Sequence, residues 1–250
     1  MKLAVLADLH ANSPALDAVL NDLPTSVDTV VYLGDFVGVM GFPQETVAAA
    51  REHADYAVKG NHDVAVLERN EGHVNSRSLS EFELEHTKTN LTDEQVDWIT
   101  GLQAYAELPD IELLLAHAQP RPEAAVGITP GNTGVNKGEF PRVAAAVDGT
   151  TYEYVLLGHT HDQAVLDCSQ FGNDVTVLNP GSVGQPMGEA EYAVVETGNG
   201  TVNCRTVEYD ATPIKTRLRD AGVPGTWWRL PSLHDRRITK PTALIRYAWV

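Results

Sequence analysis

The stretch Tyr56-Ala57-Val58-Lys59-Gly60-Asn61-His62-Asp63 is a short apolar run followed by a glycine, an amide, an imidazole and a carboxylate. The apolar run predicts a strand, and the polar side chains stand at its exit. Such side chains are costly to bury without partners, so we expect a metal ion or a charged substrate just beyond the strand. Other strands should then deliver similar side chains to the same place.

Two strand-like runs that precede this stretch follow the same pattern. Residues 3–7 lead to Asp8 and His10, and residues 29–33 lead, through a glycine, to Asp35. A helical pattern lies between the two runs, and this βαβ order predicts a parallel sheet in an α/β fold. Ligands of open α/β sheets bind at the carboxyl ends of the strands, which is where these side chains lie.

Helices are predicted on either side of the second strand. The first has Ser13 as its N-cap and apolar residues at helical spacing, and the second covers residues 43–53. Residues 64–110 are predicted to form a helical insertion that flanks the site. Within the insertion, Thr92 and Gln95 have the spacing of a capping box.

Strand-like runs resume in the second half of the chain. Residues 111–116 lead to His117, and residues 154–157 lead, through a glycine, to His159 and His161. The last third contains short runs that predict an antiparallel second sheet, at residues 164–168, 175–179, 192–196 and 202–207. A glycine-rich loop at residues 127–138 is a candidate wall of a site, and a short helix is predicted at residues 141–147.

The ends of five predicted strands therefore offer carboxylate, amide and imidazole groups: Asp8, His10, Asp35, Asn61, His62, His117, His159 and His161. This mixture suits Zn, Mn, Fe or Ni better than Mg or Ca. One tetrahedral ion does not need so many ligands, whereas two ions about 3.5–4 Å apart that share a carboxylate use all but one. Alone, Asp-x-His and Gly-Asp are common structural features, Asn-His after a glycine is a weak signal and His-x-His is a moderate metal signal. It is their combination that indicates a metal centre.

The combination resembles the calcineurin-like metallophosphoesterase family. The matching residues are 8–10, 34–35, 60–63, His117 and 158–161, and the resemblance covers about residues 1–210. Asn179-Pro180-Gly181-Ser182-Val183-Gly184-Gln185-Pro186 is similar to a signature of the short bacterial and archaeal phosphodiesterase branch. The resemblance implies a four-layer α/β/β/α sandwich of two mixed sheets. The chain departs from the branch at Ala11 and Ala118, where glycine is usual.

By position, the resemblance implies two divalent ions, with manganese favoured and iron, zinc and nickel as alternatives. The implied ligands are Asp8, His10 and His161 for one ion, Asn61, His117 and His159 for the second, and Asp35 as the bridge, together with a water or hydroxide. His62 is implied to be catalytic, either as the proton donor to the leaving oxygen or as a group that stabilises phosphoryl charge. Asn12 and Ser182 are expected to bind substrate.

The expected function is hydrolysis of a phosphoester, as a phosphodiesterase or a phosphatase. Two cations lower the pKa of a shared water, so that a hydroxide is present near neutral pH. A hydrolase of dinucleoside polyphosphates or other nucleotides is an alternative that the same chemistry serves. A regulatory or scaffold protein with the same fold is an alternative of another class, although such members have lost part of the constellation, including the histidine that matches His62.

Composition limits the other functions. The 250 residues carry a net charge of −16, from 34 acidic and 18 basic side chains, which argues against stable nucleic-acid binding. Residues 211–250 are by contrast basic, and we expect this tail to pack on the acidic body. Two cysteines do not make a disulfide framework. We therefore expect a cytoplasmic protein without a membrane span that acts on a small phosphoester or nucleotide. The formation of homo-oligomers is compatible with the sequence.

Overall fold

The computed structural model describes residues 1–38, 40–67, 86–87, 89–118, 147, 149, 151–185 and 187–221. The glycine-rich loop at residues 127–138, most of the helix predicted at 141–147 and the tail beyond Ala221 lie outside these residues. Among the described helices, none is long and apolar enough to cross a membrane.

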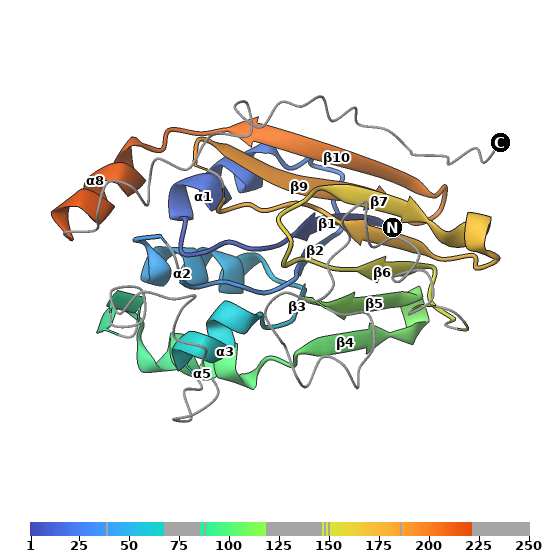
Figure 1. Cartoon of the computed structure of the whole chain (residues 1–250), viewed down its shortest axis with the longest axis horizontal. Helices are drawn as coiled ribbons and strands as arrows, with labels where there is room; N and C mark the ends of the chain where they lie inside the picture. The colour runs from blue at the N-terminus through green and yellow to red at the C-terminus, as the bar shows by residue number, and fades with distance from the viewer. Residues whose placement is uncertain are drawn as a thin grey trace.

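Sheet A has the strand order β10-β9-β1-β2-β3 (Figure 1). Its strands are β1 (Lys2–Leu6), β2 (Thr29–Tyr32), β3 (Tyr56–Ala57), β9 (Glu189–Glu196) and β10 (Thr201–Glu208). The first three are parallel, and β9 is antiparallel to β1, with Leu3 opposite Val195. The parallel strands confirm the βαβ prediction and bring their carboxyl ends to one edge.

Sheet B has the strand order β4-β5-β6-β8-β7. Its strands are β4 (Tyr105–Leu108), β5 (Leu113–Ala116), β6 (Tyr154–Leu156), β7 (Ala164–Asp167) and β8 (Thr176–Asn179). The three central strands are parallel, and an antiparallel strand closes each edge. Two mixed sheets of five strands with helices therefore confirm the predicted α/β class.

Helices in the described part of the chain include α1 (Ser13–Asp22), α2 (Pro43–His53), α3 (Asn61–Leu67), α5 (Asp93–Gly101) and α8 (Thr212–Asp220), with short 3₁₀ turns η1 (Pro109–Ile111) and η2 (Cys168–Phe171). Alternate residues of β1 face opposite sides, as the pleat requires. Ala4 and Leu6 pack in the core with residues of α1, α2 and α3. Leu3 and Val5 pack between the two sheets. Burial on both faces explains the continuous apolar sequence of this strand.

The prediction that the last four strands form a separate antiparallel sheet is wrong. β9 and β10 join sheet A beside β1, whereas β7 and β8 join sheet B, where β8 is parallel to β6. The apolar alternation that identifies each strand does not determine its partner, because either sheet can accept an apolar hairpin at its edge.

The helical insertion predicted at residues 64–110 is wrong at its end, and its residues 68–85 lie outside the described residues. β4 falls inside this range and pairs with β5, with Tyr105 opposite Ala116. α5 confirms the helical part, and its capping box is formed, since Gln95 N donates to Thr92 Oγ1 at 3.3 Å and Thr92 N to Gln95 Oε1 at 3.1 Å.

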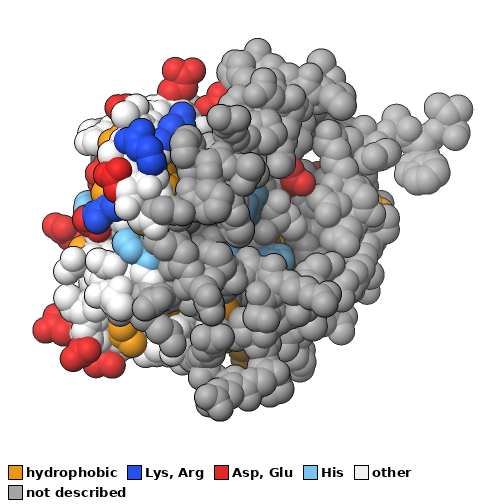
Figure 2. Space-filling model, turned by 60° about the vertical axis from the view of Figure 1, so that its left-hand side comes forward, with side chains coloured by type: hydrophobic (Ala, Val, Ile, Leu, Met, Phe, Trp, Pro, Cys, Tyr) orange, Lys and Arg blue, Asp and Glu red, His pale blue; other side chains and the backbone are white. Residues whose placement is uncertain are grey.

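The charge of the chain is unevenly placed. Figure 2 shows acidic side chains spread over the described part of one face, whereas Lys and Arg side chains gather in one area of it. The sequence predicts that the tail packs on the body. The structure describes this tail as far as Ala221, a part that includes α8. Ile214 and Leu218 are buried, and Arg217 Nη2 lies 3.4 Å from Glu45 Oε1.

Candidate metal centre

The candidate ligands follow the carboxyl ends of five parallel strands. Asp8 and His10 follow β1, Asp35 follows β2, and Asn61 is the first residue of α3, after β3. From sheet B, His117 follows β5, and the pair His159 and His161 follows β6. The two sheets pack face to face with these ends together, so residues that are far apart in sequence meet at one edge.

The backbone turns sharply at these positions. Asp8, His10, Asp35, His159 and His161 have φ angles of 57°, 49°, 55°, 72° and 55°. Non-glycine residues rarely adopt this left-handed conformation, and each costs about 1–3 kcal/mol. Such strain persists where a site requires it, which points to a functional role for this edge.

The first group of donors consists of Asp8, His10 and His161. The Nε2 atoms of the two histidines lie 3.0 Å apart, and Asp8 Oδ1 lies 3.3 Å from His161 Nε2 and 4.0 Å from His10 Nε2. Asp8 is fully buried, and its carboxylate accepts hydrogen bonds from His159 N. Two ring nitrogens and a carboxylate that converge on one point are the donors a cation requires.

The second group lies beside the first. His117 Nε2 is 3.0 Å from Asn61 Oδ1 and 3.3 Å from Asp35 Oδ2. The same Asp35 oxygen is 3.9 Å from His10 Nε2, so this carboxylate stands between the two groups. The ring of His159 lies 5.2 Å from that of His117, which brings the last predicted ligand to this group.

Burial lowers the pKa of two of the four candidate ligand histidines, whereas nearby carboxylates raise the pKa of the other two, His117 and His161. Burial, with the nearby His62 and His161, lowers the pKa of His10 to about 3, and burial lowers that of His159, so both are neutral near pH 7. Burial also disfavours the charged form of His117, but Asp35 outweighs it and raises this pKa to about 10. His117 Nδ1 donates to Leu33 O at 2.6 Å, which leaves Nε2 to face the site, where a cation would displace its proton.

The carboxylates stay charged in the absence of an ion. Burial by itself would raise the pKa of Asp8 and of Asp35, yet each is lowered. His161 is the main cause of the lowered pKa of Asp8, and His117 is the main cause of the lowered pKa of Asp35. The described residues thus contain a buried Asp/His cluster of a kind that fits divalent metal ions.

A family model, the calcineurin-like phosphoesterase superfamily domain, matches residues 1–200. The chain belongs to this superfamily. It is 28% identical to a metallophosphoesterase from Sphaerobacter thermophilus, with a TM-score of 0.72 over 92% of this chain and 97% of that chain. An uncharacterised protein from Methanocaldococcus jannaschii is 28% identical over 236 residues, 83% of this chain and 88% of the relative. A hypothetical protein from Pyrococcus horikoshii shares the fold at 20% identity, with a TM-score of 0.74 over 91% and 96% of the two chains.

His62 of this phosphoesterase chain lies at the edge of the cluster. Its ring is 4.8 Å from that of His10, and its backbone N donates to Asp35 Oδ1 at 2.8 Å. Its Nδ1 is buried against Gly38, where a Cβ atom would lie 2.7 Å away. Nε2 is therefore the nitrogen that can reach a substrate. The predicted catalytic role of His62 stays a prediction, because His62, His10 and Asp35 also lie close enough to share an ion.

Asp63 is a residue of the site whose role we did not predict. Its Oδ2 accepts hydrogen bonds from Asp35 N at 2.9 Å and Gly60 N at 2.8 Å, and its Oδ1 accepts from Val37 N at 3.2 Å. Burial and the charge of Asp35 raise its pKa to about 7. Asp63 therefore joins two loops that carry candidate ligands. Its position three residues after Gly60, at the third position of α3, is the spacing at which a carboxylate reaches back to a helix N-cap.

The expected substrate-binding role of Asn12 and Ser182 stays a prediction, and both side chains are buried beside the cluster. Asn12, and not Ser13, caps α1 by accepting from Ala15 N, and its Nδ2 donates to Gly184 O and Tyr209 Oη. Ser182 Oγ donates to Asp8 O at 2.9 Å and accepts from Gln185 N at 2.9 Å. With their hydrogen bonds used inside the protein, both residues fix the loops around the cluster.

Proposed function

We propose that this chain is a two-metal hydrolase of small phosphoesters, either a phosphodiesterase or a phosphatase. The observation that carries the proposal is the position of Asp35, whose Oδ2 lies between His117 Nε2 at 3.3 Å and His10 Nε2 at 3.9 Å. A carboxylate with donor groups on both sides is the arrangement in which two cations share a ligand.

The residues divide into two sets in this proposal. Asp8, His10 and His161 would hold one cation, and Asn61, His117 and His159 would hold the other, with Asp35 between them. Two such cations, manganese by preference, would lower the pKa of a water held between them and neutralise the oxygens of the phosphoryl group.

His62 would act on the leaving group. A proton on Nε2 can be passed to the leaving oxygen as its bond to phosphorus breaks, and general acids of this kind contribute about 10²–10⁴-fold in rate. The hydrogen bond from His62 N to Asp35 Oδ1 would hold the imidazole beside the metal bridge.

The charge of the protein favours a small substrate. A net charge of −16 repels polyanions at long range, so attraction must come from the cations at the site itself. The acidic protein repels a phosphoester of mononucleotide size far less than it repels a nucleic acid, because the small molecule carries fewer negative charges. We therefore propose a small phosphoester, and not a polynucleotide, as the substrate.

The test uses metal-stripped protein reconstituted with Mn, Ni, Zn or Mg. We expect Mn-loaded protein to hold about two ions per chain and to hydrolyse p-nitrophenyl phosphate or bis-p-nitrophenyl phosphate. Asp35→Asn should weaken both sites together and abolish turnover, whereas Asp97→Asn, a change at an exposed helix position, should do neither. Full activity with one ion per chain, or one tight site retained in Asp35→Asn, would refute the shared-carboxylate proposal. No hydrolysis of any phosphoester would favour a regulatory role.

A further inference from the structure

A small apolar core lies beside the metal centre and is separate from the main cores. It is formed by buried residues from four parts of the chain: Ala11, Met40, Met187, Ala211, Ile214 and Leu218. α8 contributes Ile214, with 0% of its surface exposed, and Leu218, with 3%. The opposite wall comes from Ala11 and Met40, which belong to the loops after β1 and β2.

The loops that α8 covers carry candidate metal ligands and contact the predicted catalytic residue His62. Ala11 directly follows His10, and Met40 N donates to His10 O at 3.0 Å. Phe42 N donates to Ala11 O at 2.9 Å, so the two loops are hydrogen-bonded together. The loop after β2 also contains Gly38, against which His62 Nδ1 is buried. A shift of these loops would therefore move both His10 and His62.

Ala11 has a strained backbone conformation and also packs in the same apolar core as α8. Its φ of 56° is left-handed, a conformation that costs an alanine about 1–2 kcal/mol relative to the right-handed region. Its methyl group, however, belongs to the same apolar core as Ile214 and Leu218. Alanine at this position thus gives the loop of His10 an apolar contact that glycine would lack.

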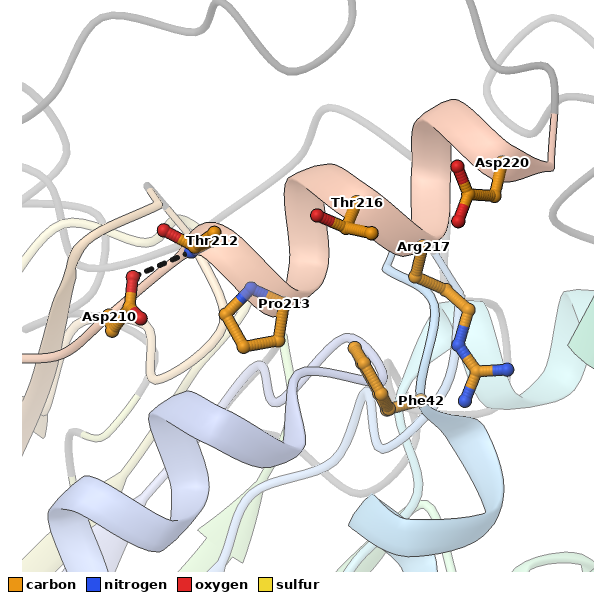
Figure 3. A pocket seen from close by; sticks show the side chains of 7 residues that line it. All are labelled: Phe42, Asp210, Thr212, Pro213, Thr216, Arg217 and Asp220. Carbon is orange, nitrogen blue, oxygen red and sulfur yellow. Dashed lines mark hydrogen bonds between the residues drawn. The ribbon is translucent and has the colours of Figure 1, made fainter.

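A second contact of α8 is made by Arg217 with Phe42, the residue before α2. Figure 3 shows the Arg217 side chain extending from α8 toward the Phe42 ring, beside an open pocket of about 490 Å³. The guanidinium carbon lies 4.6 Å from the centre of that ring. Arg217 also pairs with Glu45 at 3.4 Å, but both side chains are 40% or more exposed, and such pairs are worth about 0–1 kcal/mol. The apolar contacts of Ile214 and Leu218 are therefore the stronger attachment.

We propose that α8 is a positioning element of the active site, with Ile214 and Leu218 as positioning residues for His10 and His62. The family model ends at residue 200, and α8 lies after that point. The inference rests on the proposed function where it concerns turnover. Its effect on metal binding can be measured without any substrate.

The experiment compares Leu218→Ala with Leu166→Ala in the full chain. Leu166 of β7 is a matched control, because it is 1% exposed and packs in the core on the other side of sheet B. Each change should cost about 2–5 kcal/mol of stability. Leu218→Met, which keeps the volume, serves as the rescue variant. All assays are done at a temperature at which thermal unfolding shows every variant folded.

We expect Leu218→Ala to bind Co²⁺ about tenfold more weakly than the wild type and to change its visible absorption spectrum, which reports ligand geometry. We expect kcat to fall by about tenfold or more with little change in KM, because small displacements of reacting groups are costly. Leu166→Ala should leave Co²⁺ binding, spectrum and kcat unchanged, and Leu218→Met should restore all three.

Two results would overturn the inference. One is a Leu218→Ala variant that is folded and has the wild-type Co²⁺ affinity and spectrum. The other is an equal loss in Leu166→Ala, which would reduce the effect to general destabilisation. If the wild type hydrolyses no phosphoester, the proposed function fails, but the Co²⁺ measurements still decide whether α8 positions the cluster.

Discussion

Asp63 shows how one side chain can set the geometry of a cluster that it does not join. The three backbone N–H groups that it satisfies belong to Asp35, Val37 and Gly60, the last of which precedes Asn61. Asp35 in turn accepts from His62 N. The chain of hydrogen bonds therefore passes from Asp63 through Asp35 to His62, and it makes the position of the proposed proton donor depend on the proposed bridge.

Asp63→Asn should lower both stability and metal affinity. The side-chain amide of asparagine has only one acceptor oxygen. If this oxygen accepts the hydrogen bonds from Asp35 N and Gly60 N, the NH₂ group faces the Val37 N–H, and two donors then oppose each other. The loss of one buried hydrogen bond costs about 1–3 kcal/mol. Chemical denaturation and Mn²⁺ titration measure the two effects, with Asp97→Asn as the control. Unchanged Mn²⁺ affinity in a destabilised variant would limit Asp63 to a folding role.

His62→Gln should separate proton transfer from metal binding. We expect near-normal metal content and a loss in turnover of about 10²–10⁴-fold for an alkyl phosphoester, whose leaving oxygen needs a proton. The loss should shrink for p-nitrophenolate, which leaves without one. His53→Gln is a suitable control, because His53 is exposed on α2. A halved metal content would make His62 a ligand, and equal losses for both substrates would indicate charge stabilisation.

The candidate ligands could be recognised from sequence because each follows an apolar run directly. The carboxyl ends of parallel strands lie along one edge of the sheet. The position of the residue after each strand therefore follows from the strand itself, whatever the side chain of that residue is. The roles of Asp63 and Asn12 could not be found in this way. Both act through backbone groups of loops, and those loops have left-handed turns, as at Asp8 and Asp35, that apolar spacing does not encode.

At the scale of elements, Asn12 joins α1 to the loop before β9 and to the residue that follows β10. Asn12→Ala removes the N-cap of α1 and two donated hydrogen bonds, to Gly184 O and to Tyr209 Oη. We expect a loss of about 1–3 kcal/mol in unfolding free energy, because the partners stay buried. Asn12→Asp keeps the cap oxygen and should lose less at the helix. Thermal unfolding and KM measure the outcome, and a raised KM at unchanged stability would favour the predicted substrate-binding role over the structural one.

The strands themselves could be predicted more securely than their partners. Apolar runs located β1, β2, β5, β6 and the strands of the last third, because burial on one or both faces leaves a pattern in the sequence. Pairing depends on which edge a hairpin meets in space. β9 pairs with β1, which is far from it in the chain, and β10 pairs with β9. β4 was missed because its four residues, YAEL, include an exposed glutamate and so lack the apolar run that marks short strands such as β2 and β6.

At the scale of the whole molecule, charge should govern stability. The protein carries a net charge of −16 at pH 7, and like charges on a compact body repel one another. The Debye length falls from about 10 Å at 0.1 M salt to about 3 Å at 1 M, so added salt screens this repulsion. The arrangement of the site does not depend on this effect, because its charges are buried and paired within a few ångströms.

We therefore expect the melting temperature of metal-free protein at pH 7.5 to rise between 0.1 and 1 M KCl. The sign follows from the fact that screening weakens repulsion more in the compact state, where the charges are closer, than in the unfolded chain. Near pH 5, close to the isoelectric point of about 4.8, the net charge almost vanishes and the same salt step should have little effect. Differential scanning calorimetry at both pH values measures the difference. An equal rise at both would assign the effect of salt to apolar burial, because that contribution does not depend on the net charge.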